Sequence, residues 1–217
     1  MKVFISKAPS ESVKLTQALG QKDVELVSQS LIQTSAIAFE MPRHRIDWLF
    51  FSSKNAVRHF FKAVHVPAGV KLGAIGNGTA GELSKFGRVD YVGNGDPISV
   101  KAEFASLVGS EFVVFPVAEA SLKTIQRDWP PENHANVFCY RTMSKPRIIP
   151  ACVAYVFTSP SNVNSFLSCN KLPVDGKMLA GPTTSRHISS LTGVYPHVLK
   201  DYEVSTICEA IFSLPKS

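Results

Sequence analysis

Cysteine and histidine are too few and too scattered in this chain to suggest a metal or redox centre. Only four of the 217 residues are cysteines, and no two of them form a Cys-x-x-Cys pair: Cys139, Cys152, Cys169 and Cys208. We expect reduced, mostly buried thiols in a cytoplasmic protein. The six histidines likewise form no close pair, which argues against a metal site: His44, His59, His65, His134, His187 and His197.

Long apolar runs and clustered basic residues are also missing. No stretch approaches the length of a membrane span, and the apolar run at 1–6 is too short for a signal peptide. Lys and Arg number 23 against 17 Asp and Glu, giving a net charge of +6. Because the basic residues do not run together, we expect neither a nucleic-acid nor a membrane partner. A scattered positive surplus suits a small polyanionic ligand at least as well.

Short apolar segments alternate with amphipathic ones along the whole chain. This pattern predicts an α/β fold with parallel sheets. Strands are expected at 2–5, 24–27, 35–40, 48–51, 71–75, 91–92, 111–115, 136–141, 153–157, 178–180 and near 198. Helices are expected at 10–19, 54–64, 79–86, 99–108, 121–129, 161–169, 183–191 and 204–214, with a proline-bearing linker at 144–150.

The sequence contains an internal repeat. An apolar strand, hydroxyl residues and a helix occur at 51–61 and again at 157–167, with Phe51 matching Phe157 at an offset of 106. In the next turn Gly76 matches Gly181 at an offset of 105. This period is far too long for a solenoid, so it predicts two similar lobes.

Hydroxyl side chains follow the predicted strands of both copies, where ligands bind to parallel sheets. They are Ser52, Ser53, Thr158, Ser159, Ser161, Thr183 and Thr184. Taken singly, each is explained as a helix cap, and either Ser159 or Ser161 can cap the helix that follows. Their presence in both copies favours ligand contact, since hydroxyls and free backbone N–H groups suit a ligand with many carboxylates.

The segment Gly76–Gly81 reads G-x-G-x-x-G between a strand and a helix, which is the pattern of a dinucleotide site. Its context weakens that interpretation, because it lies outside the first strand–helix–strand unit and its sister loop at 181–186 lacks the later glycines. A tight turn is the plainest alternative. We favour an anion-binding loop in which Gly76, Asn77 and Thr79 present backbone N–H groups to a carboxylate.

Five pieces of the sequence, taken together, resemble the uroporphyrinogen-III synthase family. They are Asp47–Val57, Ala74–Gly76 with Thr79–Ala80, Tyr140–Thr142, Phe157–Ser161 and Gly181–Thr184. They fall in the family's order and span the whole chain. The resemblance implies two α/β lobes, each a parallel sheet flanked by helices, joined by a two-stranded linker. The first lobe would comprise 1–35 and 145–217, the second 42–135, and the linker strands 36–41 and 136–144.

The resemblance also implies an activity. A member of this family cyclises hydroxymethylbilane, a linear tetrapyrrole, to uroporphyrinogen III with loss of water and inversion of the last pyrrole ring, and it does so as a monomer without a cofactor. Tyr140 is then the expected general acid, because a phenol with a pKa near 10 stays protonated at neutral pH. The bland alternative for Tyr140 is an interface aromatic.

Two positions depart from the family pattern. Lys7 stands where many relatives have Arg, and Val117 stands where many have Arg or Gly after a strand that we expect to end at Phe115–Pro116. A rival function also stays open at this point: a non-catalytic, two-lobed binding protein for an anionic small molecule. Turnover of the tetrapyrrole distinguishes the two functions.

Overall fold

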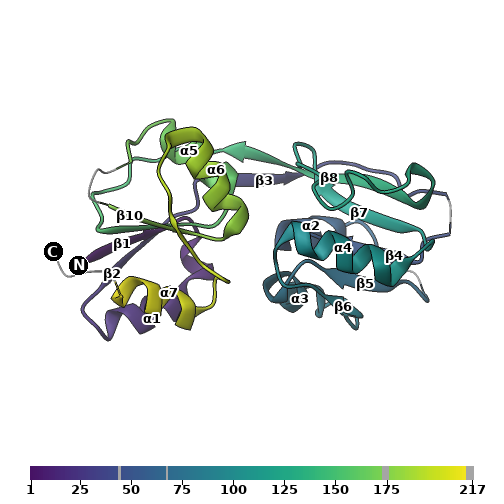
Figure 1. The fold of residues 1–217 in the computed structure, drawn as a ribbon, viewed down its shortest axis with the longest axis horizontal. Coiled ribbons are helices and arrows are strands. Elements are labelled where there is room, and N and C mark those ends of the chain that lie inside the picture. Colours follow the sequence, from purple (N-terminus) through teal and green to yellow (C-terminus); the bar gives the residue numbers. More distant parts are fainter. Residues whose placement is uncertain (44, 67, 173–175, 214–217) are drawn as a thin grey trace. The chain divides into compact units, whose positions relative to one another are not determined.

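The computed structural model describes residues 1–43, 45–66, 68–172 and 176–213. It divides into two compact units (Figure 1). Unit 1 comprises Met1–Gln33 and Met143–Ser217, and unit 2 comprises Thr34–Thr142. The chain therefore begins in unit 1, completes unit 2 and returns. The sequence sets 36–41 and 136–144 apart as linker strands, whereas nearly all of these residues belong to the compact unit 2.

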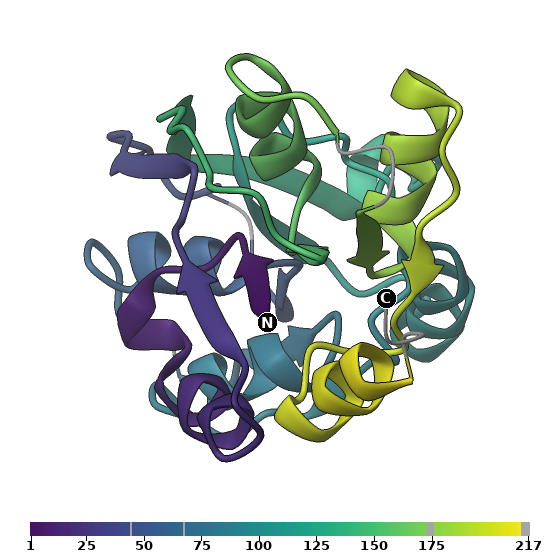
Figure 2. The same cartoon turned by 90° about the vertical axis from the view of Figure 1, so that its left-hand side faces the viewer.

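Unit 1 is a five-stranded parallel sheet with helices on both faces. Its strand order is β11-β10-β9-β1-β2. Figure 2 shows α5 and α6 over one face of this sheet and α1 and α7 over the other. The strands are β1 (Lys2–Ile5), β2 (Glu25–Ser28), β9 (Ala154–Phe157), β10 (Lys177–Ala180) and β11 (His197–Val198). The helices are α1 (Val13–Gly20), α5 (Pro160–Leu167), α6 (Pro182–Thr192) and α7 (Val204–Phe212), with a 3₁₀ turn at Pro9–Glu11.

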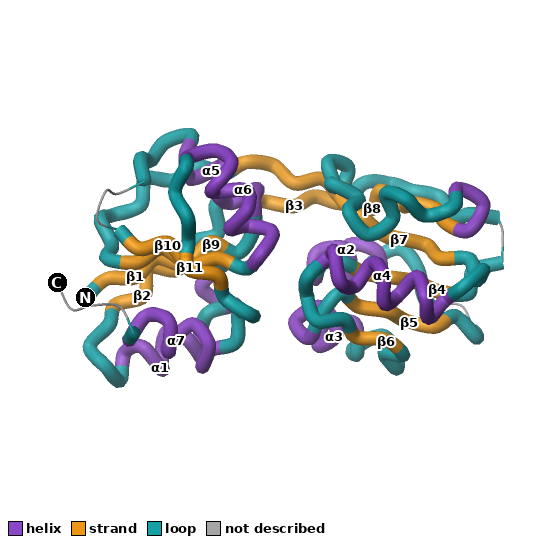
Figure 3. Tube along the Cα trace, viewed as in Figure 1, coloured by secondary structure: helices purple, strands orange, loops and turns teal. Residues whose placement is uncertain are grey.

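Unit 2 is a six-stranded sheet of order β3-β8-β7-β4-β5-β6. Its strands are β3 (Ile32–Ala36), β4 (Trp48–Phe51), β5 (Lys71–Ala74), β6 (Tyr91–Val92), β7 (Val113–Ala118) and β8 (His134–Ser144). Its helices are α2 (Lys54–Phe60), α3 (Asn77–Leu83) and α4 (Pro97–Val108), with a 3₁₀ turn at Pro131–Asn133. Figure 3 shows β3 and β8 as neighbouring strands. They run antiparallel, since Ile37 N–H bonds to Cys139 O while Lys145 N–H bonds to Leu31 O.

The predicted duplication is visible in the topology. Both units contain the sequence strand–helix–strand–helix–strand: β4-α2-β5-α3-β6 in unit 2 and β9-α5-β10-α6-β11 in unit 1. Beyond β9 the sheet of unit 1 continues with two strands, and beyond β4 the sheet of unit 2 continues with two equivalent strands and then β3. In unit 1 these two strands, β1 and β2, come from the start of the chain, while in unit 2 the equivalent β7 and β8 follow the repeat.

Strand residues alternate between two apolar layers, because successive side chains point to opposite faces of a sheet. In unit 1, Val3 and Ile5 pack with α1 and α7, while Phe4 packs with α5 and α6. In unit 2, Phe51 packs with α2 and α3, while Phe50 packs with α4. Both faces of both sheets are covered, which is typical of parallel sheets and explains their nearly continuous apolar strands.

The predicted helix at Ser121–Trp129 is wrong. This stretch contains turns and no helix. The Ser121 hydroxyl accepts a hydrogen bond from the Lys123 N–H at 3.2 Å, and Lys123 has a left-handed φ of 52°. Serine side chains that bond to nearby backbone groups compete with helix formation in this way. The segment still packs through Ile125 and Trp129 against the α4 face of the sheet.

Several predicted ends were also wrong. β3 ends at Ala36 rather than near 40, α2 ends at Phe60 rather than Val64, and β7 continues through Pro116 to Ala118. Proline fits within β7 because the ladder with β4 stops at Val114, so its missing N–H does not interrupt that ladder. Leu214, the predicted end of α7, lies outside the described residues, as does His44.

The thiols differ from the expectation that most are buried. Cys139 and Cys152 are buried, Cys208 is half-buried and Cys169 is exposed, all four free. Burial raises the pKa of Cys139 to about 12, so this thiol is unreactive at neutral pH.

Candidate functional site

The predicted hydroxyl and glycine residues lie beyond the carboxyl ends of adjacent strands in each unit. In unit 2, Phe51 of β4 pairs with Ala74 of β5, so the loops at 52–53 and 76–79 are neighbours. In unit 1, Phe157 of β9 pairs with Ala180 of β10, so the loops at 158–161 and 181–184 are neighbours. Each unit therefore presents its own pair of loops.

Two equivalent serines cap the helices of the two copies. The Ser53 hydroxyl accepts a hydrogen bond from the Ala56 N–H at 3.0 Å, and the Ser159 hydroxyl accepts one from the Asn162 N–H at 3.3 Å. Both serines have extended backbones, as helix caps do. Of the two capping candidates in unit 1, Ser159 is the cap and Ser161 is an exposed residue of α5.

Tyr140 joins the capping serine of unit 2. Its phenolic oxygen lies 3.1 Å from the Ser53 oxygen, while its ring is only 7% exposed and belongs to the apolar layer beneath α2. Burial raises the pKa of the Tyr140 phenol above its usual 10, and the hydrogen bond with Ser53 offsets part of this rise. Tyr140 is therefore protonated throughout the neutral range.

His59 is a member of this cluster that the sequence did not reveal. Its ring stacks on Tyr140 at a centroid distance of 5.2 Å and an interplanar angle of 10°. Its Nε2 lies 2.9 Å from the Thr34 hydroxyl. In the sequence, His59 is only a polar residue on the apolar face of a predicted helix, and this pattern does not indicate which residues it would contact.

In the glycine loop of unit 2 only the first glycine is tightly confined. A Cβ at Gly76 would lie 3.1 Å from the Gly95 Cα, whereas a Cβ at Gly81 would meet open space. The third glycine of a dinucleotide motif permits close packing of helix on strand, and Gly81 has no such contact. Asn77 is exposed, while the Thr79 side chain is buried. At Gly78 a Cβ would lie 3.3 Å from the Lys54 Cε, so an exposed ammonium chain runs along this loop.

In unit 1 the Thr158 hydroxyl connects the ends of β1 and β9. It donates to the Ser6 carbonyl at 2.8 Å, and the Ser6 hydroxyl accepts from the Thr158 N–H at 2.8 Å. Ser6 is almost fully buried, whereas Thr158 is half-buried. Thr158 therefore has a structural role in addition to any contact with a ligand.

In unit 1 the Tyr202 hydroxyl holds the glycine loop at 181–184 in place. This hydroxyl donates to the Phe157 carbonyl at 2.8 Å and accepts from the Gly181 N–H at 2.7 Å. A Cβ at Gly181 would lie 3.1 Å from this oxygen, so the close approach requires glycine. Thr183 is half-buried and Thr184 is buried. Burial raises the pKa of Tyr202, while hydrogen bonds with Gly181 and Thr184 lower it in part.

The two departures from the family pattern have different surroundings. The Lys7 ammonium lies 5.5 Å from the centre of the Tyr202 ring, so it remains a cation close to the loop at 181–184. Val117 is 3% exposed and sits inside β7. An apolar side chain buried in a strand cannot bind a carboxylate, so this position offers no ligand contact.

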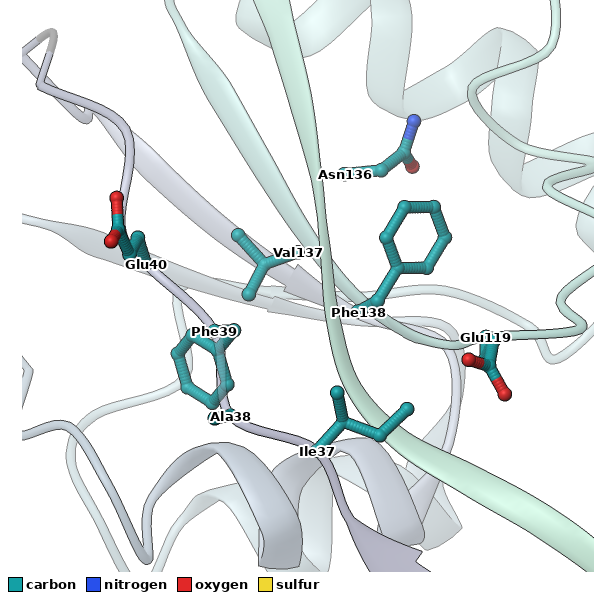
Figure 4. Close-up of a pocket in the computed structure, with 8 residues that line it drawn as sticks. All are labelled: Ile37, Ala38, Phe39, Glu40, Glu119, Asn136, Val137 and Phe138. Carbon is teal, nitrogen blue, oxygen red and sulfur yellow. The ribbon is translucent and has the colours of Figure 1, made fainter.

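One surface pocket contains none of the predicted site residues. It has a volume of about 420 Å³ in unit 2 (Figure 4), and its lining residues are Ile37, Ala38, Phe39, Glu40, Glu119, Asn136, Val137 and Phe138. The figure shows Glu40 and Glu119 at opposite sides of this group. Its charged lining residues are carboxylates, which would repel a polycarboxylate ligand. We therefore place the candidate site at the loops beyond the strands.

Within the described part of the chain, no three His, Cys, Asp or Glu side chains gather in a way that could hold a metal ion. No helix among the described residues is long and apolar enough to cross a membrane.

Solved structures share the fold of this chain. A mutant uroporphyrinogen III synthase from the extremely thermophilic bacterium Thermus thermophilus matches 98% of this chain and 97% of its own length, with 14% identity and a TM-score of 0.63. Uroporphyrinogen-III synthetase from Helicobacter pylori 26695 matches 98% of both chains, with 14% identity and a TM-score of 0.65. A comparison with curated protein sequences gave no match. The family model for uroporphyrinogen-III synthase HemD matches residues 13–192, and the chain belongs to this family.

Proposed function

We propose that this chain, a uroporphyrinogen-III synthase by family, closes hydroxymethylbilane into uroporphyrinogen III with Tyr140 as general acid. The reaction removes water from a linear tetrapyrrole and inverts the last pyrrole ring. The observation that carries the acid role is the 3.1 Å contact of the Tyr140 hydroxyl with Ser53, which ties a protonated phenol to the first hydroxyl loop.

The direction of the Ser53 hydrogen bond determines whether the phenol can act. Ser53 accepts from the Ala56 N–H as a helix cap and still has one proton to donate. When it donates that proton to the Tyr140 oxygen, the phenolic proton is free for the leaving hydroxyl of the substrate. Departure of water then leaves the substrate as a positively charged azafulvenium that keeps its pyrrole N–H, and the phenolate formed beside it is stabilised by the same serine.

The loops of each unit would offer contacts to the carboxylates of the substrate. We propose contacts from the hydroxyls of Ser52, Ser159, Ser161 and Thr183 and from the Asn77 amide. The hydroxyl protons of Ser53 and Thr158 are used by Tyr140 and by the Ser6 carbonyl, so these two residues would act by fixing the loops. Gly76, Thr79 and Thr184 are buried, so they would act through the loop backbone that they shape. Lys54 and Lys7 add positive charge beside the glycine loops of unit 2 and unit 1, respectively.

The main task of the enzyme would be positioning. Left in water, an azafulvene of this kind closes without inversion, so the protein must hold the bent chain until the substituted carbon of the last ring attacks. Holding reactants in one geometry can supply several kcal/mol of rate enhancement without a strong chemical catalyst. This explains how hydroxyls, amides and two lysines suffice.

The test supplies hydroxymethylbilane and separates the I and III porphyrin isomers after oxidation. We expect the III isomer from the wild-type chain, and formation of the I isomer alone would refute synthase activity. Tyr140→Phe should fold, bind product and lose about 10²-fold in rate, the low end for general acid catalysis. The matched control is Tyr195→Phe, because Tyr195 is 86% exposed. A wild-type rate for Tyr140→Phe would leave Tyr140 as a packing residue.

The proposal also includes a cytoplasmic location and a monomeric state. Four free cysteines support a reducing compartment. Light scattering on the purified protein measures the mass directly, and a value twice 23.7 kDa would refute the monomer.

A further inference from the structure

His59 occupies a place where an apolar residue would be expected. It lies on the buried face of α2 together with Ala56, Val57 and Phe60, and its side chain is 8% exposed. Its Nδ1 is buried and has no hydrogen-bond partner. A buried polar atom without a partner is destabilising, so a phenylalanine would fill this place at lower cost. The imidazole therefore calls for an explanation beyond packing.

The contacts of His59 connect two strands. One face stacks on Tyr140 of β8, and Nε2 reaches the Thr34 hydroxyl of β3 at 2.9 Å. With the proton on Nε2, the ring donates to Thr34 and leaves only a lone pair at Nδ1; with the proton on Nδ1, a buried N–H would be unsatisfied. We assign the first arrangement, because an orphaned donor is the rarer case in proteins.

The charge state of His59 follows from its surroundings. Burial is the main cause of a lowered pKa, and the nearby Lys62 and Arg58 lower it further. The ring facing Tyr140 is therefore a neutral imidazole at neutral pH. A neutral ring stacked on the phenol adds no positive charge that would promote its ionisation.

We infer that His59 is a positioning residue for Tyr140, tethered by Thr34 so that the phenol keeps its hydroxyl at Ser53. The stacked imidazole restricts tilting of the Tyr140 ring about its Cβ, which is the motion that would carry the hydroxyl away from Ser53 at 3.1 Å. Thr34 prevents the imidazole from rotating with the phenol. This inference rests on the proposed acid role of Tyr140 for its catalytic consequence, but not for the contact itself.

Kinetics can separate positioning from packing. His59→Phe keeps a stacked ring and loses the tether, and Thr34→Val removes the same tether from the other side. We expect each to lower kcat by about tenfold with KM unchanged, since small misplacements of reacting groups are costly. The double variant should resemble either single variant, because residues acting through one bond are not additive. His134→Phe is the control, since His134 of the same unit bonds to the Pro130 carbonyl away from this cluster.

The decisive comparison uses the Tyr140→Phe background. If His59 acts through the phenol, the double variant His59→Phe with Tyr140→Phe should have the same kcat as Tyr140→Phe alone. A role confined to packing would instead lower kcat by the same factor in both backgrounds, and this result would overturn the inference. Wild-type kcat in both His59→Phe and Thr34→Val would overturn it as well.

A second measurement is independent of turnover. Tyrosine labelled with ¹³C at Cζ gives one signal per tyrosine, and Tyr140→Phe identifies that of Tyr140. We expect His59→Phe and Thr34→Val to shift this signal and His134→Phe to leave it unchanged. An unshifted Tyr140 signal in both test variants would overturn the positioning role. If Tyr140→Phe turns over at the wild-type rate, the acid assignment alone fails, and the carbon signal still decides whether His59 holds the ring.

Discussion

Replacing Tyr202 with phenylalanine removes one oxygen atom and, with it, the hydrogen bonds to two backbone groups of unit 1. That oxygen bridges the Phe157 carbonyl at 2.8 Å and the Gly181 N–H at 2.7 Å, at the ends of β9 and β10. The ring remains, so its packing and its contact with the Lys7 ammonium survive. Two backbone groups of buried residues are left without a partner.

The expected loss follows from these two groups. A typical hydrogen bond contributes about 1 kcal/mol net, and an unsatisfied buried group costs about 1–3 kcal/mol. With two such groups, we expect Tyr202→Phe to lower the free energy of unfolding by about 2–6 kcal/mol. With a urea m-value of about 2 kcal/mol/M, the midpoint should fall by about 1–3 M.

The assay is urea unfolding followed by far-ultraviolet circular dichroism, with Tyr195→Phe as the control. Tyr195 is 86% exposed, so its variant should match the wild type. Tryptophan fluorescence gives a second probe that reports on the unfolding of unit 2 alone, because Trp48 and Trp129 both lie in that unit. If Tyr202→Phe is as stable as Tyr195→Phe, the two backbone groups have found other partners and the bridging role is refuted.

Three further outcomes are expected. Gly78→Ala should fold normally, because only the flexible Lys54 chain approaches its Cβ; calorimetry should show weaker product binding and no NAD binding, whereas micromolar NAD affinity would restore the dinucleotide interpretation. Ser159→Ala should lower the free energy of unfolding by about 1 kcal/mol as a lost helix cap, and an unchanged urea midpoint would contradict this. The lowered pKa of His59 means that the unfolded chain takes up its proton first, so stability should decline as pH falls below 6.5; a series of unfolding curves should show a shallower decline for His59→Phe, and identical slopes would count against the shift.

Periodicity and duplication predicted most of the fold. Alternating apolar strands and amphipathic helices indicated α/β architecture, and the matched loops at Phe51 and Phe157 lie in equivalent elements. The failure at 121–129 had a local cause, since the hydroxyl of Ser121 captures a backbone N–H that a helix would use. Boundaries such as the end of β7 failed because strand ends depend on partners that are distant in sequence.

The predicted site residues were found from their position after strands, but their accessibility was not predictable. Thr79 and Thr184 are buried while Ser52 and Ser161 are exposed, although all four follow strands of the repeat. Whether a hydroxyl faces solvent depends on which face of the helix it lies on and on which other segments pack against that face. The cluster of His59, Thr34 and Tyr140 could not be predicted at all, since it assembles from three elements far apart in the chain.

The insertion of unit 2 within unit 1 has a consequence for synthesis on the ribosome. Unit 2 is one continuous stretch, so it can fold as soon as Thr142 has left the exit tunnel. Unit 1 cannot, because β1 pairs with β9, and β9 is translated about 150 residues later. Until then the apolar segment Val3–Ile5 lacks its neighbour and is a potential site for chaperone binding or misassociation. Because Val3 and Ile5 also pack with α7, they are fully covered only once Val204–Phe212 has emerged as well.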